Sequence, residues 1–518
     1  DPVQKPAAVK RLIQFYEDAM TKDDKNREGP NVKPLLDQIV PPLTEVAQSG
    51  QLDQRTQGLL LSKLADMRHP TAVPALVKAL EDYRPDDKRA DQYDTDMGDV
   101  VRNLGIMKSK EASMALFNVF KNLRASWPKA QNKGFYRVLH DALLEIADPA
   151  WEDELIKLLD RPIKSLKQKF QRDVINEVYW QTTAAELLGI LKSKKAVVPL
   201  FKVVLSGFKY NMHTTAISAL IKIGKPSIDA GVKLLNGEDA DLIEYAKKEY
   251  IRAAEDKDQK VDKKLEEAAG NAYKQYAALI VANIGRNECT DPMLKIIDEG
   301  DEVTKAILAR ELPKLPADPK VTEAFKKVWS DTNMSLQIPP GENAKEALSG
   351  AVANFFDKDL TQWLGESVLD LKGDDAPYVQ SSALEVLMKL ATKSQWDLVE
   401  KISNIAITYP KPTTLGKAYE KELKASKEAI DKCGDDPACW HKELTASANQ
   451  KQETQIIGIK AAYMVAALEG DAAAGKLADD IPNIQNDAIR FAAASAIDRL
   501  SPKGNNAIAD KLQKLVDD

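Results

Sequence analysis

Apolar positions recur along the chain at helical spacing, in pairs of segments separated by short polar corners. The clearest copy runs from Gln181 to Leu205, where one apolar run ends at Leu191 and a second begins at Ala196. The corner between the two runs is Lys192-Ser193-Lys194. Apolar residues spaced by three and four are typical of an amphipathic helix. The segment is therefore predicted to be two antiparallel helices joined by a tight turn.

Variants of this helix pair occupy most of the chain. Two further clear pairs are Gln54–Met67 with Ala72–Tyr83, and His213–Ile223 with Ser227–Leu235. A helix pair of this size buries its apolar face only by stacking on neighbouring pairs. The pattern therefore predicts an all-α fold, a right-handed α-solenoid of about 11–12 helix pairs. The corners fall near residues 70, 109, 149, 193, 225, 292, 318, 358, 393, 435, 470 and 502.

The repeat is interrupted in three places. The longest gap between corners contains Asp241–Glu267, which is dense in Lys, Glu and Asp. We predict a helix there, a polar turn near Asp256–Asp262, and a long helix that resumes to Ile284. Two interpretations of the charged stretch stay open, namely a solvated helix face and a protruding arm for a partner. Two further breaks are predicted to be loops because they contain prolines: Asn333–Glu342, with Pro339-Pro340-Gly341, and Tyr409–Thr414.

These breaks suggest five consecutive parts. They are an N-terminal helical cap at 1–50, repeats with a basic bias at 51–238, and an irregular repeat with the charged helical insertion at 239–290. Further repeats follow at 291–410, and C-terminal repeats with a polar cap at 411–518.

Composition agrees with a helical repeat protein. The 518 residues are 44% hydrophobic and only 6% aromatic, and the net charge of −6 gives no overall electrostatic footprint for nucleic acid. No apolar run approaches the roughly 18 to 20 residues that a spanning helix needs. The chain starts at Asp1 and its first residues lack the apolar core of a signal peptide. We expect that a preceding segment was removed, either a signal peptide or residues lost when the protein was prepared.

The form of the repeats resembles the HEAT-repeat family. The first helix is rich in Ala and Leu and ends in a small residue, as Ala184–Gly189 does, and the second begins with Ala-Val and Pro. The resemblance covers roughly Gln54 to Leu515 and is weakest at 239–290 and 410–450. It implies HEAT-type helix pairs and no reaction, since HEAT proteins are mostly scaffolds, adaptors and transport receptors. Further matching segments are Ala72–Leu76, Ala196–Leu200, Ala216–Gly224 and Ala492–Leu500.

Cys433 and Cys439 bracket a predicted helix corner. Gly434 suits the left-handed cap of the first helix, and Asp435 or Asp436 can cap the next helix, which starts at Pro437. The two thiols then lie at facing ends of antiparallel neighbours, so we predict a disulfide. Two reduced thiols remain an alternative.

A metal site that combines the two cysteines with His441 is a second alternative, although it lacks a fourth ligand nearby. Cys289 lies at another corner, where we expect a half-buried apolar role. A disulfide would place the protein in an oxidising compartment. A bonded corner in a HEAT array looks like the periplasmic or outer-membrane-tethered HEAT proteins of bacteria, many of which are lipoproteins. A membrane tether is expected only through a removed N-terminal segment.

Other candidate chemistry is sparse. Asp24–Gly29 looks like the first half of a calcium loop, but Leu35 stands where the bidentate acid belongs, so we predict a plain capped loop. No phosphate loop, nucleophile elbow or zinc-protease motif is present in the sequence. We predict no catalytic residue, no cofactor, no metal and no small-molecule ligand. The four histidines, His69, His140, His213 and His441, are scattered over different repeats and are expected on corners or helix faces.

Positive charge concentrates in one part of the chain. Residues 121–225 contain 18 Lys or Arg against 10 Asp or Glu. Such a surplus can form a patch that binds an acidic protein, a phosphate-bearing lipid or the acidic half of another copy, or it can be an ordinary solvated connection. The candidate basic patch is Lys157, Arg161, Lys164, Lys167, Lys169, Arg172, Lys192, Lys194 and Lys195.

Together these features predict a non-enzymatic scaffold or adaptor that binds other proteins and no nucleic acid. We place it outside the cytoplasm, in a bacterial cell-envelope assembly such as a motility, pilus or secretion complex. Two alternatives stay open: a cytosolic HEAT-repeat adaptor or transport receptor, and a HEAT-like lyase or enzyme-associated subunit.

Overall fold

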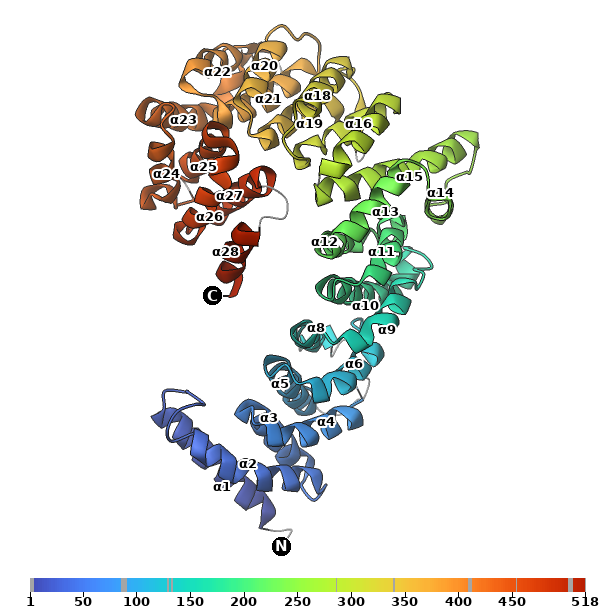
Figure 1. Cartoon of the computed structure of the whole chain (residues 1–518), viewed down its shortest axis with the longest axis vertical. Coiled ribbons are helices and arrows are strands. Elements are labelled where there is room, and N and C mark those ends of the chain that lie inside the picture. Colours follow the sequence, from blue (N-terminus) through green and yellow to red (C-terminus); the bar gives the residue numbers. More distant parts are fainter. Residues whose placement is uncertain are drawn as a thin grey trace. The chain divides into compact units, whose positions relative to one another are not determined.

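The structure, a computed structural model, describes residues 4–84, 91–127, 130–131, 134–285, 287–338, 341–408, 412–452, 454–501 and 506–517. These residues belong to two compact units. Unit 1 comprises residues 1–230 and 241–270, and unit 2 comprises 231–240 and 271–518. Helices stacked in sequence make up nearly all of both units, so the predicted all-α solenoid is confirmed (Figure 1). The five-part division suggested by the sequence stays a prediction.

Unit 1 contains two rows of helices (Figure 1). In one row α3 packs on α5 and α5 on α8, followed by α10 on α12; in the other α2 packs on α4 and α4 on α6, followed by α9 on α11. The bounds are α1 Lys5–Lys22, α2 Lys33–Gln48, α3 Gln54–Met67, α4 Val73–Asp82, α5 Asp91–Ile106, α6 Ser113–Asn122, α8 Phe135–Ile146, α9 Glu152–Leu159, α10 Gln171–Ile190, α11 Val197–Val204, α12 His213–Ile223 and α14 Ala240–Asp256. Residues of α13 Lys225–Leu235 and α15 Lys263–Ile284 fall in both units.

Four helix corners of unit 1 share the same backbone conformation. Each first helix is followed by a residue with a positive φ, at Arg68, Lys108, Ala147 and Lys192. The left-handed conformation stops the helix, and it is costly for residues other than glycine. A short 3-10 turn then precedes the second helix, such as Lys194–Ala196, whose Ala196 N–H donates to the Ser193 hydroxyl. The second helices α4 and α11 therefore begin one residue later than the apolar pattern suggests, at Val73 and Val197.

Small residues let the first helices approach each other closely. A Cβ added to Gly105 on α5 would lie 2.7 Å from the Cα of Ala142 on α8. A Cβ added to Gly189 on α10 would lie 2.8 Å from the Cα of Ala219 on α12. The same contact thus occurs at two different junctions between repeats. Glycine and alanine at these positions are required by the helix spacing.

Unit 2 is a second stack of helices. In it α17 packs on α19 and α19 on α21, and α25 packs on α21, α24 and α27. The bounds are α16 Thr290–Glu299, α17 Glu302–Ala309, α18 Pro319–Asp331, α19 Ala344–Ala351, α20 Lys358–Val368, α21 Ala376–Leu390, α22 Trp396–Ser403, α23 Glu420–Cys433, α24 Pro437–Thr445, α25 Gln455–Glu469, α26 Ala473–Asp480, α27 Asp487–Leu500 and α28 Asn506–Asp517.

Short antiparallel strands lie in or directly beside both predicted proline loops of unit 2. β1 Gln337–Ile338 pairs with β2 Glu342–Asn343, and β3 Ala406–Ile407 pairs with β4 Thr413–Thr414. A ladder of two residues is too short to show an alternating pattern in the sequence. Pro339, Pro340 and residues 409–411 lie outside the described part of the chain.

Buried lysines bind the ends of preceding helices. Lys460 is 1% exposed, and its Nζ donates to the carbonyl oxygens of Met388 (2.9 Å) and Ala391 (3.4 Å) at the end of α21. Lys345 donates to the Thr332 carbonyl after α18, and Lys209 to the Leu159 carbonyl that ends α9. Burial lowers the pKa of Lys460 to about 7 and that of Lys209 to about 8. These ammonium groups satisfy carbonyls that the helix itself leaves without donors.

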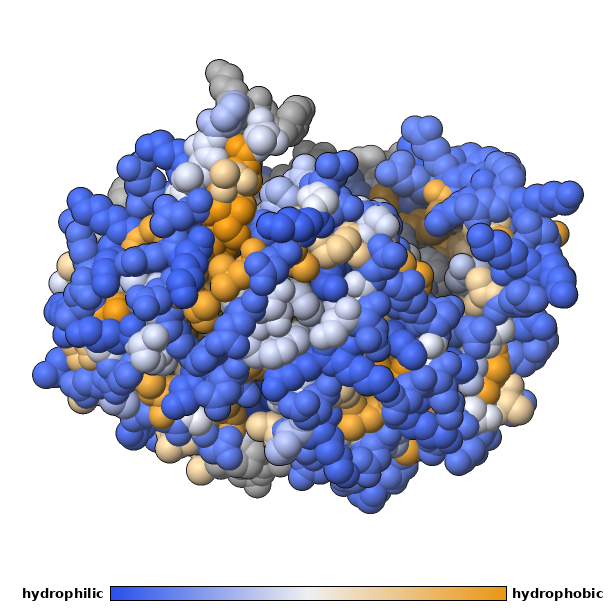
Figure 2. Space-filling model, turned by 90° about the horizontal axis from the view of Figure 1, so that it is seen from above, coloured by the Kyte–Doolittle hydropathy of each residue, from blue (hydrophilic) through white to orange (hydrophobic). Residues whose placement is uncertain are grey.

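The outer surface is mainly polar. The face drawn in Figure 2 is mostly hydrophilic, with narrow hydrophobic strips between hydrophilic areas. Among the helices of the described residues, none combines the length and the apolar character that crossing a membrane requires. Large exposed apolar side chains are scattered over both units, for example Tyr210, Tyr378 and Phe491.

Candidate binding surface

The candidate basic patch is divided by the length of α10. Lys169 and Arg172 lie at its N-terminal end, and Lys192 and Lys194 follow its C-terminal end. The helix has 20 residues and so separates the two ends by roughly 30 Å. Arg161, Lys164 and Lys167 belong to the connection before α10, which joins them to the first group. Seven of the nine residues therefore fall into two groups at opposite ends of α10.

Four of the nine cations have a carboxylate partner. Lys157 pairs with Glu154 at 2.7 Å on α9, and Arg161 pairs with Glu177 at 2.5 Å. The other two pairs are Lys167–Asp258 (3.0 Å) and Lys195–Glu152 (3.0 Å). Within the described part of the chain, no ion pair involves Lys164, Lys169, Arg172, Lys192 or Lys194. At the start of α10, three cations are therefore available to bind an anion of another molecule: Lys164, Lys169 and Arg172.

The connection between α9 and α10 is held by α14, which is about ninety residues further along the chain. The Asp256 carboxylate accepts hydrogen bonds from the Ser165 hydroxyl (2.5 Å) and the Leu166 N–H (3.0 Å). These bonds lower the pKa of Asp256, the Ser165 bond contributing most. Arg252 donates from Nη1 to the Ile163 carbonyl at 2.9 Å. The connection is therefore fixed by the helix that the charged insertion provides.

One face of α14 is anchored in unit 1. The Arg252 guanidinium lies 3.9 Å from the Phe208 ring centroid and donates to Glu249 at 2.8 Å. Glu249 also accepts a hydrogen bond from the Ser206 hydroxyl. The predicted turn and long second helix of the insertion are confirmed, since α14 ends at Asp256 and α15 begins at Lys263. The part of the insertion in α14 is neither wholly solvated nor a free arm.

A cavity of about 390 Å³ opens between the held connection and α10. Trp180 is 7% exposed, with its indole N–H donating to the Phe120 carbonyl and Arg161 lying 4.6 Å from its ring centroid. Asn176 is 4% exposed and accepts a hydrogen bond from the Ser126 N–H. The polar and aromatic members of the lining are Arg124, Arg161, Lys164, Ser165, Phe170, Asp173, Asn176, Glu177 and Trp180.

A second cavity, of about 840 Å³, adjoins the first at Arg124, which lines both. It runs along the ends of α4 and α6. The Arg124 guanidinium lies 5.9 Å from the ring centroid of Trp127, and no ion pair of Arg124 occurs among the described residues. The other polar residues that line this cavity are Glu81, Tyr83, Arg84, Asn118 and Asn122. Together the two cavities are lined by aromatic rings, side-chain amides and cationic side chains.

Sequence reasoning found two cations of the first cavity, Arg161 and Lys164, but missed Arg124 and several of the other residues in its lining. Arg124 and Asn176 come from different repeats, and Asp256 acts from about ninety residues away. No local pattern marks such residues, because packing between repeats brings them together. The sequence feature that came closest to indicating these contacts was the charged insertion Asp241–Glu267. Its acidic residues offset the positive charge of the connection between α9 and α10.

The predicted disulfide joins α23 to α24 in unit 2. Cys433 and Cys439 are bonded, with their Cα atoms 5.3 Å apart. Gly434 has a φ of 53°, and the Asp436 carboxylate accepts from the Ala438 N–H, as the corner sequence indicates. His441 contacts Asp480 (2.5 Å) and Glu469 (3.3 Å) and does not join the cysteines. The alternative metal site with His441 therefore has no support in the geometry.

Cys289 is 0% exposed, not half-buried, because it lies against the buried first turn of α16.

Removal of the disulfide is expected to lower the free energy of unfolding by about 2 kcal/mol, because the bond closes a short loop in the unfolded chain. The comparison is between wild type and the Cys433→Ala/Cys439→Ala variant in urea denaturation. Wild type treated with reductant should match the variant. A wild type that loses no stability on reduction would contradict the expectation.

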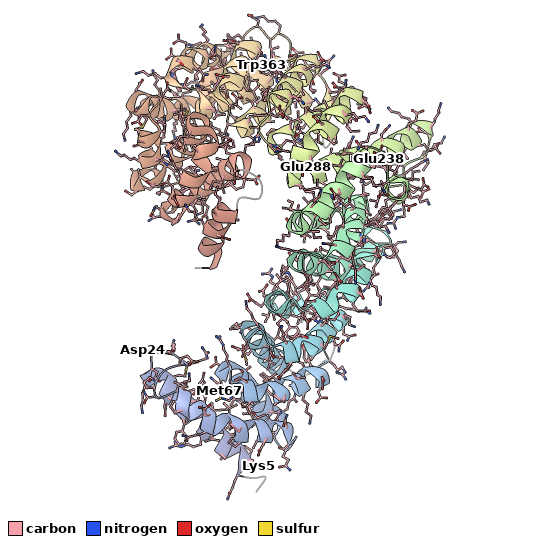
Figure 3. The ribbon with its side chains drawn as sticks, in the orientation of Figure 1. Lys5, Asp24, Met67, Glu238, Glu288 and Trp363 are labelled. Atoms are coloured by element: carbon pink, nitrogen blue, oxygen red, sulfur yellow. A yellow bond between two sulfur atoms is a disulfide. The ribbon has the colours of Figure 1, made fainter. Side chains whose placement is uncertain are left out.

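The candidate calcium loop is a plain turn. Asp24 lies in the loop after α1 (Figure 3), and Asp23 organises that loop by accepting hydrogen bonds from the N–H groups of Asn31 (2.7 Å) and Val32 (3.0 Å). In the parts of the chain that the structure covers, no cluster of three His, Cys, Asp or Glu side chains is arranged to hold a metal ion.

The histidines lie apart, on corners and helix faces as expected. In unit 1, His69 contacts Asp37, His140 contacts Glu186 and Asp141, and His213 contacts the Ser206 carbonyl. The fourth, His441, is the one beside the disulfide-bonded corner.

Comparison with known proteins assigns no family. No family model matches the sequence, and no curated protein matches it. The crystal structure of Kap121p is 13% identical over 92% of this chain and 59% of its own, with a TM-score of 0.38. Two structures of the karyopherin Kap121p are each 13% identical. The one bound to the extreme C-terminus of the protein phosphatase Cdc14p has a TM-score of 0.24 over 99% of this chain and 72% of that chain. The one bound to the SUMO protease Ulp1p has a TM-score of 0.19 over 100% and 68%. This chain thus spans 59% of the length of the first of these, a similarity too weak to assign a function.

Proposed function

We propose that this protein is a non-enzymatic scaffold that binds other proteins through the surface at the start of α10. The observation that carries the proposal is the pair of adjoining cavities in unit 1, whose lining includes Arg124 and Lys164, two cations with no carboxylate partner among the described residues. Stacked repeats present such a surface on a firm support, and charged groups on it can steer and orient a partner. The partner's contacts would be spread over several repeats.

We further propose that the scaffold works in an oxidising compartment, within a bacterial cell-envelope assembly. The bonded Cys433–Cys439 corner supports this location, because disulfides persist where thiols are not kept reduced. Mass measurement of protein taken from its native compartment tests the location. A bonded pair supports the proposal, and two free thiols contradict it.

Capture of partners from native membranes and extracts tests the scaffold proposal. The tagged full chain is compared with a Lys164→Glu/Arg172→Glu variant and with a Lys192→Glu/Lys194→Glu variant, which carries the same charge change at the other end of α10. We expect the first variant to lose most of the partner captured by wild type, and the second to retain it. Capture that is the same for all three chains, or recovery of the chain alone, would contradict the proposal.

A further inference from the structure

We infer that the two adjoining cavities act as one groove that binds an extended acidic segment of the partner protein. The inference rests on the proposed function and adds the chemical class of the ligand. The groove runs from the ends of α4 and α6, past Arg124, to the connection before α10. An extended chain of about ten residues spans roughly 33 Å, which suits a groove that crosses several repeats.

Unused hydrogen-bond donors define the charge of the ligand. Arg124 and Lys164 line the groove and have no carboxylate partner among the described residues. The Nδ2 of buried Asn176 likewise has no acceptor in the described part of the chain, while its oxygen is occupied by Ser126. Lys169 and Arg172 stand exposed nearby. Groups that only donate are satisfied by carboxylate and carbonyl oxygens.

Acidic residues in the lining favour a polypeptide over a phosphate-bearing surface. Glu177 is occupied by Arg161 and by the Gln181 amide, whereas Asp173 and Glu81 remain as negative charges beside the cations. Closely spaced phosphates would be repelled by them, but an alternating chain can place a carboxylate at each cation and neutral residues between.

Amide and aromatic groups suit the uncharged part of such a chain. Asn118 and Asn122 lie one turn apart on α6, and both line the groove. Side-chain amides can both donate to and accept from a peptide backbone. Trp180 and Trp127 each carry an arginine over the ring, so that a planar cation is held on an apolar face.

Hydrogen bonds from α14 fix one wall of the groove in the absence of a ligand. Asp256 and Arg252 fix the connection that carries Lys164, through Ser165, Leu166 and the Ile163 carbonyl. A wall held in place loses little conformational entropy on binding. Asp256 is therefore a positioning residue, and its removal should weaken binding although it makes no contact with the ligand.

Fluorescence anisotropy with a labelled peptide of alternating glutamate and glycine, about ten residues long, tests the inference on the full chain. We expect saturable binding that a peptide of alternating lysine and glycine does not reproduce. The variant Arg124→Gln/Lys164→Gln should weaken binding about tenfold, as loss of charge-assisted hydrogen bonds implies. Asp256→Asn should weaken it several-fold. The control Lys192→Gln/Lys194→Gln removes the same charge and should change the affinity less than twofold.

Each of the following outcomes would overturn the inference. Equal weakening by both charge variants would show a general effect of net charge. Competition by inorganic phosphate or by phosphatidylglycerol vesicles, at concentrations like that of the peptide, would assign the groove to phosphate. Absence of binding while partner capture still depends on Lys164 and Arg172 would refute the acidic-segment ligand and leave the scaffold proposal standing. If partner capture is also unaffected, both fail.

Discussion

Gly105→Val is expected to lower the free energy of unfolding of unit 1 by about 3 kcal/mol, and Gly105→Ala by about 2 kcal/mol. A Cβ at this position would lie 2.7 Å from the Cα and 2.8 Å from the Cβ of Ala142, so helices α5 and α8 must move apart. The contact is between backbones, and no side-chain rotation relieves it. Because the first helices stack in one row, displacement at this junction also disturbs their packing on either side.

The control is another glycine on the same helix. A Cβ added to Gly98 has no neighbour within 4 Å among the described residues, so Gly98→Ala should raise stability by about 0.5 to 1 kcal/mol through helix propensity alone. Urea denaturation of both alanine variants measures the difference. Equal effects of Gly98→Ala and Gly105→Ala would contradict the close approach of α5 and α8.

Arg252→Met is expected to lower the free energy of unfolding of unit 1 by about 2 to 3 kcal/mol. The change removes the hydrogen bond to the Ile163 carbonyl, the contact with the Phe208 ring and the ion pair with Glu249, whose side chain is 12% exposed. A carboxylate that loses its cation while largely buried is costly. The effect is smaller than for a fully buried pair because 34% of the Arg252 side chain is exposed.

Lys248→Met provides the matched control, since it removes one positive charge from the same helix. Lys248 pairs with Glu244 at 3.4 Å on the surface, where such pairs contribute about 0.3 to 0.5 kcal/mol. Hydrogen exchange of residues 160–167 should accelerate in Arg252→Met and not in Lys248→Met. Unchanged exchange in both variants would show that α14 does not hold the connection.

The helices could be predicted closely from the apolar pattern. Gln54–Met67 and His213–Ile223 have the predicted bounds, because their apolar faces and corner residues agree. The short 3-10 turns before the second helices could not be predicted, since their residues fit the helical pattern equally well. The β1–β2 and β3–β4 ladders also escaped prediction, because two residues are too few to display a period.

The candidate site could be predicted only in part. A surplus of Lys and Arg marked the region, and Lys164, Lys169 and Arg172 belong to the connection before α10 and to the first turn of that helix. Lys192 and Lys194 seemed to belong with them because they are near in sequence, yet a whole helix separates the two groups. Charge density along a sequence does not show which carboxylates from elsewhere, such as Glu177 or Asp258, neutralise a given cation.

Hydrogen exchange of the full chain, measured alone and with the partner captured from native membranes, tests the central claim most directly. Binding in the groove predicts slower exchange at residues 118–127 and 160–176, with the corner at 192–195 unchanged. Slower exchange confined to that corner, or to unit 2, would contradict the account.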